Sequence, residues 1–75
     1  MERDSAIRLD GMLMGALGNL DGIAHHMKNN LPDEEYARLV RSVGQSMAAL
    51  VELSHALHSL FPDITPAELR PPEQP

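Results

Sequence analysis

The feature that most constrains this chain is a pair of apolar stripes, one on each side of residues 29–32. In each stripe the positions recur at alternating steps of three and four, the period that places side chains along one side of an α-helix. The second stripe contains Tyr36, Val40, Val43, Met47, Leu50, Ser54, Leu57 and Phe61. The first stripe contains Ala6, Asp10, Leu13, Leu17, Leu20, Ala24 and Met27. We call each stripe the seam of its helix.

The two seams match in mirror order about Leu31 and Pro32. If the chain folds back there, Met27 lies opposite Tyr36, and the remaining layers follow towards the two chain ends. These layers are Ala24 with Val40, Leu20 with Val43, Leu17 with Met47, Leu13 with Leu50, Asp10 with Ser54, and Ala6 with Leu57. The sequence therefore predicts an all-α protein, a single domain over residues 1–75 folded as an antiparallel two-helix hairpin.

The residue types at the ends of the seams predict two helices, over about 5–28 and about 33–60. The side-chain oxygen of Asp4 or Ser5 can accept a free N–H group of the first turn of the first helix. Asn29 and Asn30 suit the left-handed conformation that ends many helices, and Pro32 fits the first turn of the second helix.

Two segments depart from the helical pattern. Residues 18–22, Gly-Asn-Leu-Asp-Gly, have the composition of a turn. The seam nevertheless passes through them from Leu17 to Ala24 without a change of phase, so we expect one continuous helix. In the tail over residues 62–75, a capping box at 65–68 predicts a short helical turn anchored by Leu69, followed by a Pro-rich end.

A chain of 75 residues buries so little surface that a lone hairpin is only marginally stable. It contains no cysteine, so neither a disulfide nor a thiolate metal site can reinforce it. Small folds without such links gain stability by associating, and the simplest partner is a second copy of the same chain. We therefore expect a homodimer in which two hairpins form a four-helix bundle.

The charge of the chain excludes some partners. The net charge is −5, with only six basic residues. Binding nucleic acid without sequence preference requires a basic patch, and anionic membranes repel an acidic surface. The first residues lack the order of a signal peptide, and no apolar run is long enough to span a bilayer. We expect a cytoplasmic protein that binds neither nucleic acid nor membranes.

Four glycines, Gly11, Gly15, Gly18 and Gly22, lie on one side of the first helix, nearly opposite its seam. Each is unfavourable by roughly 0.8–1 kcal/mol relative to alanine in a helix interior. Two interpretations are open. Either a partner approaches this glycine stripe closely, where no Cβ intervenes, or the glycines are tolerated in solvent. The other candidate interaction residues are Met14 beside the stripe and the seam residues Leu17, Val43, Met47 and Leu50.

Asp10 and Ser54 interrupt the two seams at the same level. A buried carboxylate is unfavourable alone, but much less so when it accepts a hydroxyl proton. One interpretation is a polar layer that fixes the register of the helices, and the other is that the first helix frays and Asp10 is hydrated.

The histidines raise the possibility of a metal site. Glu52 and His55 match the Glu-x-x-His element of di-iron helix bundles, and His58 extends it. The seam assignment, however, turns Glu52 and His55 outwards and places His58 on the flank, so these are weak candidates. The sequence offers no catalytic triad, no phosphate-binding loop and no motif for a cofactor.

These observations favour a small protein-interaction module that acts as a homodimer and is not an enzyme. A protein partner at the glycine stripe is a further expectation. The alternative is a binder of metal or of a small molecule that uses histidines at the dimer interface.

Overall fold

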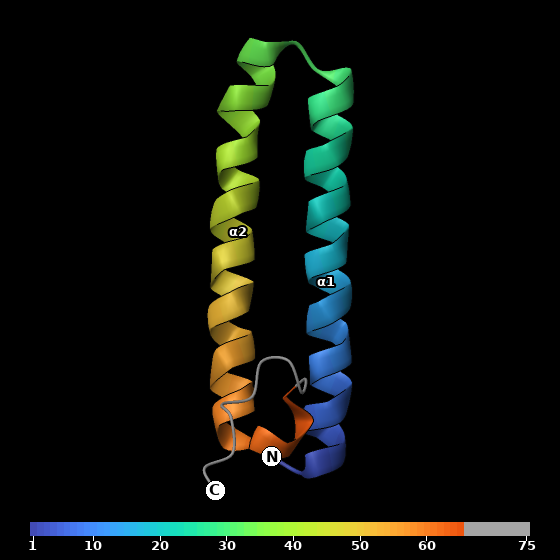
Figure 1. The fold of residues 1–75 in the computed structure, drawn as a ribbon, viewed down its shortest axis with the longest axis vertical. Helices are drawn as coiled ribbons and strands as arrows, with labels where there is room; N and C mark the ends of the chain where they lie inside the picture. The colour runs from blue at the N-terminus through green and yellow to red at the C-terminus, as the bar shows by residue number, and fades with distance from the viewer. Residues whose placement is uncertain (66–75) are drawn as a thin grey trace, which may run out of the picture.

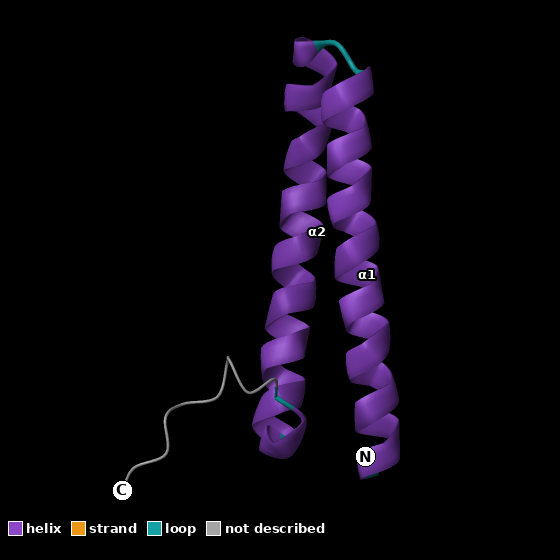
Figure 2. Cartoon of the chain, turned by 45° about the vertical axis from the view of Figure 1, so that its right-hand side comes forward, coloured by secondary structure: helices purple, strands orange, loops and turns teal. Residues whose placement is uncertain are grey.

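The chain forms two long antiparallel helices joined by a short turn (Figure 1). A computed structural model describes residues 1–65. Helix α1 spans Arg3–Asn30, helix α2 spans Asp33–Leu60, and a 3₁₀ turn, η1, spans Pro62–Ile64. The described residues contain helices and loops only (Figure 2). The predicted all-helical hairpin is confirmed, and its turn lies where the two seams predicted it.

Helix α1 runs without interruption through residues 18–22, as the phase of the seam indicated. Its first turn differs from expectation. The N-cap is Glu2, which makes no side-chain capping hydrogen bond, so Asp4 and Ser5 lie inside the helix. Extending the helix by two residues gains a backbone hydrogen bond, in which the Ala6 N–H donates to the Glu2 carbonyl at 3.1 Å.

The end of α1 also differs from expectation. No described residue adopts a positive φ, so neither Asn29 nor Asn30 ends the helix in a left-handed conformation. Instead the Asn30 side-chain amide donates to the His26 carbonyl at 2.8 Å, and Leu31 leaves the helix in an extended conformation. The Leu31 N–H donates to the Met27 carbonyl at 2.9 Å, so the helical backbone hydrogen bonds continue up to the turn.

Helix α2 begins and ends as its prolines dictate. Pro32 is its N-cap, and the Pro32 carbonyl accepts the first helical hydrogen bond, from the Tyr36 N–H at 2.9 Å. The acidic first turn lies at the positive end of the helix dipole. The helix stops at Leu60, two residues before Pro62.

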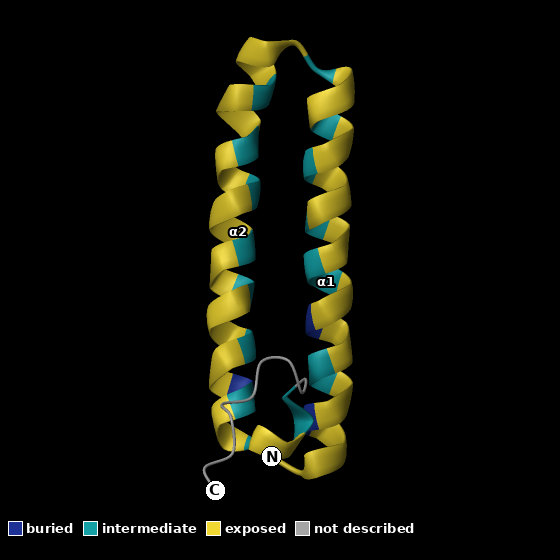
Figure 3. Cartoon of the chain, viewed as in Figure 1, coloured by how far each residue is buried: buried dark blue, intermediate teal, exposed yellow. Residues whose placement is uncertain are grey.

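Burial follows the two predicted seams (Figure 3). Every seam residue of both helices is buried or half-buried, and His58 is the one further α2 residue that is not exposed. Among the described residues only Ala6, Leu13 and Leu57 are fully buried, and they form one cluster. The residues packed around this cluster are Leu9, Leu50, Phe61 and Ile64. The core is therefore concentrated at the open end of the hairpin.

The segment after α2 returns to the core instead of leaving it. Ile64, the last residue of η1, packs against the buried cluster. Arg3 at the start of α1 forms an ion pair with Asp63 at 2.7 Å. Both side chains are more than half exposed, so this pair adds little stability. The predicted capping box, Leu69 and the Pro-rich end fall outside the described residues, except for Thr65.

Neither of the two described helices is apolar enough over sufficient length to cross a lipid bilayer. This agrees with the absence of a long apolar run in the sequence.

The buried cluster generates a prediction about stability. Leu57 is 2% exposed, so Leu57→Ala removes packed methyl groups at the centre of the core. We expect a loss of about 2–4 kcal/mol in the free energy of unfolding, measured by urea denaturation at fixed protein concentration. The control is Val51→Ala, because Val51 lies on the same helix with 39% of its surface exposed, and a change of less than about 0.5 kcal/mol is expected there. Equal losses for the two variants would show that the core is not at the open end.

Candidate functional site

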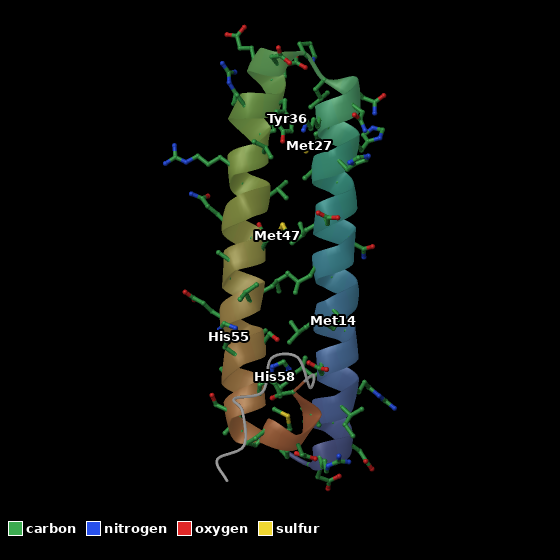
Figure 4. The ribbon with its side chains drawn as sticks, in the orientation of Figure 1. Met14, Met27, Tyr36, Met47, His55 and His58 are labelled. Carbon is green, nitrogen blue, oxygen red and sulfur yellow. The ribbon has the colours of Figure 1, made fainter. Side chains whose placement is uncertain are left out.

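One polar contact joins the two helices inside the hairpin. Oδ1 of Asp10 on α1 lies 2.8 Å from the ring nitrogen Nε2 of His58 on α2. A carboxylate can only accept, so the imidazole N–H donates. The side chains are 20% and 11% exposed, which makes this the most enclosed polar pair in the described residues. Figure 4 shows His58 between the helices at their open end.

One of the two interpretations of the polar layer pairs Asp10 with Ser54, whereas in the structure Asp10 pairs with His58. Ser54 lies half-buried in the seam but makes no hydrogen bond to Asp10. The imidazole of His58 reaches Asp10 from the position directly after the seam residue Leu57. The signal present in the sequence is that His58 directly follows the seam residue Leu57. Helical period alone places such a residue on the flank.

The other candidate metal ligands do not gather. Glu52 and His55 are exposed on α2, as expected, while His58 is occupied by Asp10. His26 lies at the opposite end of the hairpin, hydrogen-bonded with Asn30. The described part of the chain contains no group of three or more His, Cys, Asp or Glu side chains that could hold a metal ion. A metal or small-molecule site shared between two copies stays a prediction.

The glycine stripe is fully uncovered in the hairpin. Gly11, Gly15, Gly18 and Gly22 are exposed, and a Cβ built on any of them would meet nothing within 4 Å. Their φ values are negative, so the backbone conformation does not require glycine there. Neither packing within the chain nor strain therefore explains the four glycines, and a partner at the stripe stays a prediction.

The other candidate interaction residues divide into two groups. Leu17, Val43, Met47 and Leu50 are half-buried in the seams, where they join α1 to α2. Figure 4 shows Met47 between the helices, and Met27 and Tyr36 close to each other near the turn. Met14 is different, because it is 57% exposed and lies over its own helix. The seam residues thus hold the hairpin together, whereas Met14 is free to contact a partner.

The flanks of the seams define two faces of the hairpin. Residues that directly precede a seam residue lie on one side of each helix, and residues that directly follow one lie on the other side. The two helices are antiparallel, so a twofold axis perpendicular to the plane that contains them interchanges them. Residues that precede a seam residue on α1 and on α2 therefore lie on the same face of the hairpin, and residues that follow one lie on the opposite face. We call the face formed by the preceding residues the leading face and the face formed by the following residues the trailing face.

Large exposed apolar side chains are unevenly distributed between these faces. The leading face carries five of them: Met12, Ile23, Leu39, Leu53 and Leu60. The trailing face carries three: Ile7, Met14 and Val51. The trailing face also carries the charged residues Asp21, Lys28 and Arg41, whereas the leading face has no charged residue over 5–26 and 39–60. The helical period predicts the seams, whereas the two faces result from the side-by-side arrangement of α1 and α2.

Comparison with protein-family models, with curated proteins and with solved structures gave no match for this chain.

The contact between Asp10 and His58 generates a prediction for a double-mutant cycle. Asp10→Ala and His58→Ala each remove one partner of an enclosed hydrogen bond, and we expect each to destabilise the protein by about 1–2 kcal/mol. Because each variant breaks the same interaction, the double variant should be more stable than the sum of the two losses implies, by about 1 kcal/mol. The free energy of unfolding of all four proteins, measured at neutral pH, gives this coupling.

Ser54→Ala is the matched control for the cycle, since Ser54 lies at the expected level but makes no bond to Asp10. Its effect should add to that of Asp10→Ala within about 0.5 kcal/mol. Stronger coupling of Asp10 to Ser54 than to His58 would contradict the observed pairing.

The open space around the glycine stripe generates a second prediction. Replacement of Gly11, Gly15, Gly18 and Gly22 by alanine should raise the free energy of unfolding by about 3–4 kcal/mol, because each added Cβ meets no atom and helix propensity improves. Gly44→Ala, also in open space but on α2, is the single-site reference and should add about 1 kcal/mol. A four-alanine protein that is less stable, or that has lost its assembly, would show that the stripe is a close contact.

Proposed function

We propose that this protein is a small cytoplasmic interaction module that acts as a homodimer, in which two hairpins pack into a four-helix bundle, and that it has no catalytic role. The observation that carries the proposal is the small core of the single hairpin. Among the described residues three side chains are buried, while nine large apolar side chains are exposed. A hairpin that leaves so much apolar surface in water is expected to bury it against another surface.

The shape of the hairpin supports the same conclusion. Its Cα atoms extend 51 × 29 × 16 Å, so the molecule is a single layer of two helices. Stable domains need at least two packed layers, because each helix must bury its apolar surface against another element. Side-by-side packing of α1 and α2 uses the seams together with Leu9 and His58 beside them, and most residues on the two outer faces of the layer remain exposed to water (Figure 3). A second hairpin supplies the missing layer.

The proposed role follows from this assembly. The seams hold each hairpin together and one face joins the two copies, which leaves the outer helical surfaces for a further protein partner. An exposed methionine such as Met14 adapts its flexible side chain to different surfaces. The acidic net charge of −5 disfavours nucleic acid as that partner.

The homodimer is tested by sedimentation equilibrium of the purified chain. We expect a mass of twice 8.2 kDa over a wide range of protein concentration. Because folding and association are then linked, the midpoint of thermal unfolding should rise as the protein concentration is raised. A helical protein with a mass of 8.2 kDa at every concentration, and with an unfolding midpoint independent of concentration, would refute the proposal.

A further inference from the structure

We propose that the second copy docks on the leading face, through the surface formed by Met12, Ile23, Leu39, Leu53 and Leu60. This inference rests on the proposed homodimer and adds to it which of the two faces is buried between the copies. The alternatives are the trailing face, which includes Gly11 and Gly18, and the outer side of α1 with the other two residues of the glycine stripe, Gly15 and Gly22.

Charge distinguishes the two faces. Removing an unpaired charge from water is strongly unfavourable, so the cores of protein interfaces are depleted of charged residues. On the leading face the one charged flanking residue between the start of α1 and the end of α2 is Glu35, in the first turn of α2 beside the hairpin turn. A copy packed on the trailing face would instead bury Asp21 and Arg41 away from the helix ends, in addition to Lys28 beside the hairpin turn.

The order of side chains along the leading face suits helix packing. From Leu39 to Leu60 the face of α2 forms a second stripe with steps of three and four, made of Leu39, Ser42, Ser46, Ala49, Leu53, Ala56 and Leu60. Large leucines separated by small residues provide the knobs and the shallow positions through which two helices interlock. The outer side of α2 therefore repeats the pattern that its seam uses to bind α1.

The extent of the face matches the requirement of a stable dimer. Helices of 28 residues are about 42 Å long, and two of them side by side at about 9 Å present a face of roughly 800 Å². Stable protein interfaces bury about 800 Å² on each partner. One hairpin face thus supplies enough surface for a complete dimer interface.

A second copy is the occupant that this surface fits best. A face whose one charged residue, Glu35, lies beside the hairpin turn offers almost no pattern by which a charged partner could be selected or oriented. It is, however, complementary to itself, because an apolar surface of leucines and small residues packs on its own image across a twofold axis. Since the chain carries a net charge of −5, an interface that contains almost none of this charge also keeps repulsion between the copies small.

The test introduces one carboxylate on each face of the full-length protein. Leu53→Glu places a charge on the leading face, and Val51→Glu places one on the trailing face two residues earlier in the same helix, at a site of similar exposure. We expect Leu53→Glu to raise the dissociation constant of the dimer by about 100-fold or more, and Val51→Glu to raise it by less than about 5-fold. Sedimentation measures both constants, and circular dichroism verifies that both variants remain helical.

The outcomes separate the two proposals. If Val51→Glu dissociates the dimer and Leu53→Glu does not, the leading face is wrong while the homodimer stands. Equal effects of the two variants, or no effect of either, also overturn the assignment of the face. If the unmodified protein is a monomer throughout, the proposed function fails, and the inference fails with it.

A second measurement does not depend on a disruptive substitution. The chain has no cysteine, so one introduced thiol reports on one position alone. Ser46→Cys lies on the leading face and Ala48→Cys on the trailing face, both exposed in the hairpin near the middle of α2. The rate of maleimide labelling at Ser46→Cys should fall as the protein concentration is raised through the dimer range, while the rate at Ala48→Cys stays constant. The opposite result would place the interface on the trailing face.

Discussion

The packing of the two seams against each other holds this protein in its helical form. Helix α1 contains four glycines in its interior, each less favourable than alanine by about 0.8–1 kcal/mol, and none of them contacts another part of the chain. An isolated segment with this composition would be a poor helix, since most helical stability in proteins comes from tertiary packing of an apolar side. The leucines that alternate with the glycines supply that packing. Contact with α2 therefore determines the structure of α1.

Stabilisation is unequal along the hairpin. The buried cluster around Leu57 lies at the open end, where α1, α2 and Ile64 of η1 meet. The pair of Asp10 and His58 lies beside this cluster and joins the helices at one defined level. A slip of one helix along the other by a heptad would keep apolar contacts in the seams but would break this bond. We infer that the polar pair favours this register in a core that apolar contacts alone would allow to slide.

The single layer of helices connects the fold with the proposed function. A seam binds one neighbour, and in a hairpin that neighbour is the other helix of the same chain. Large apolar side chains that lie exposed beyond the seams are more numerous on the leading face than on the trailing face, and this concentration provides a basis for association. The proposed dimer would bury Leu39, Leu53 and Leu60 and leave the glycine stripe and the trailing face outside. Self-association and binding of a further protein would then use different surfaces.

The sequence alone determined the helices, the turn and the seams, because helical period and proline act locally and both halves of the chain carry the same pattern. It also determined that residues 18–22 stay helical, since the phase of Leu17, Leu20 and Ala24 outweighs local turn composition. Only the tertiary structure showed that His58 rather than Ser54 binds Asp10, because side-chain length and direction, which periodicity does not contain, determine which atoms meet. The same holds for the return of Ile64 to the core and for the two faces, which exist only once both helices lie side by side.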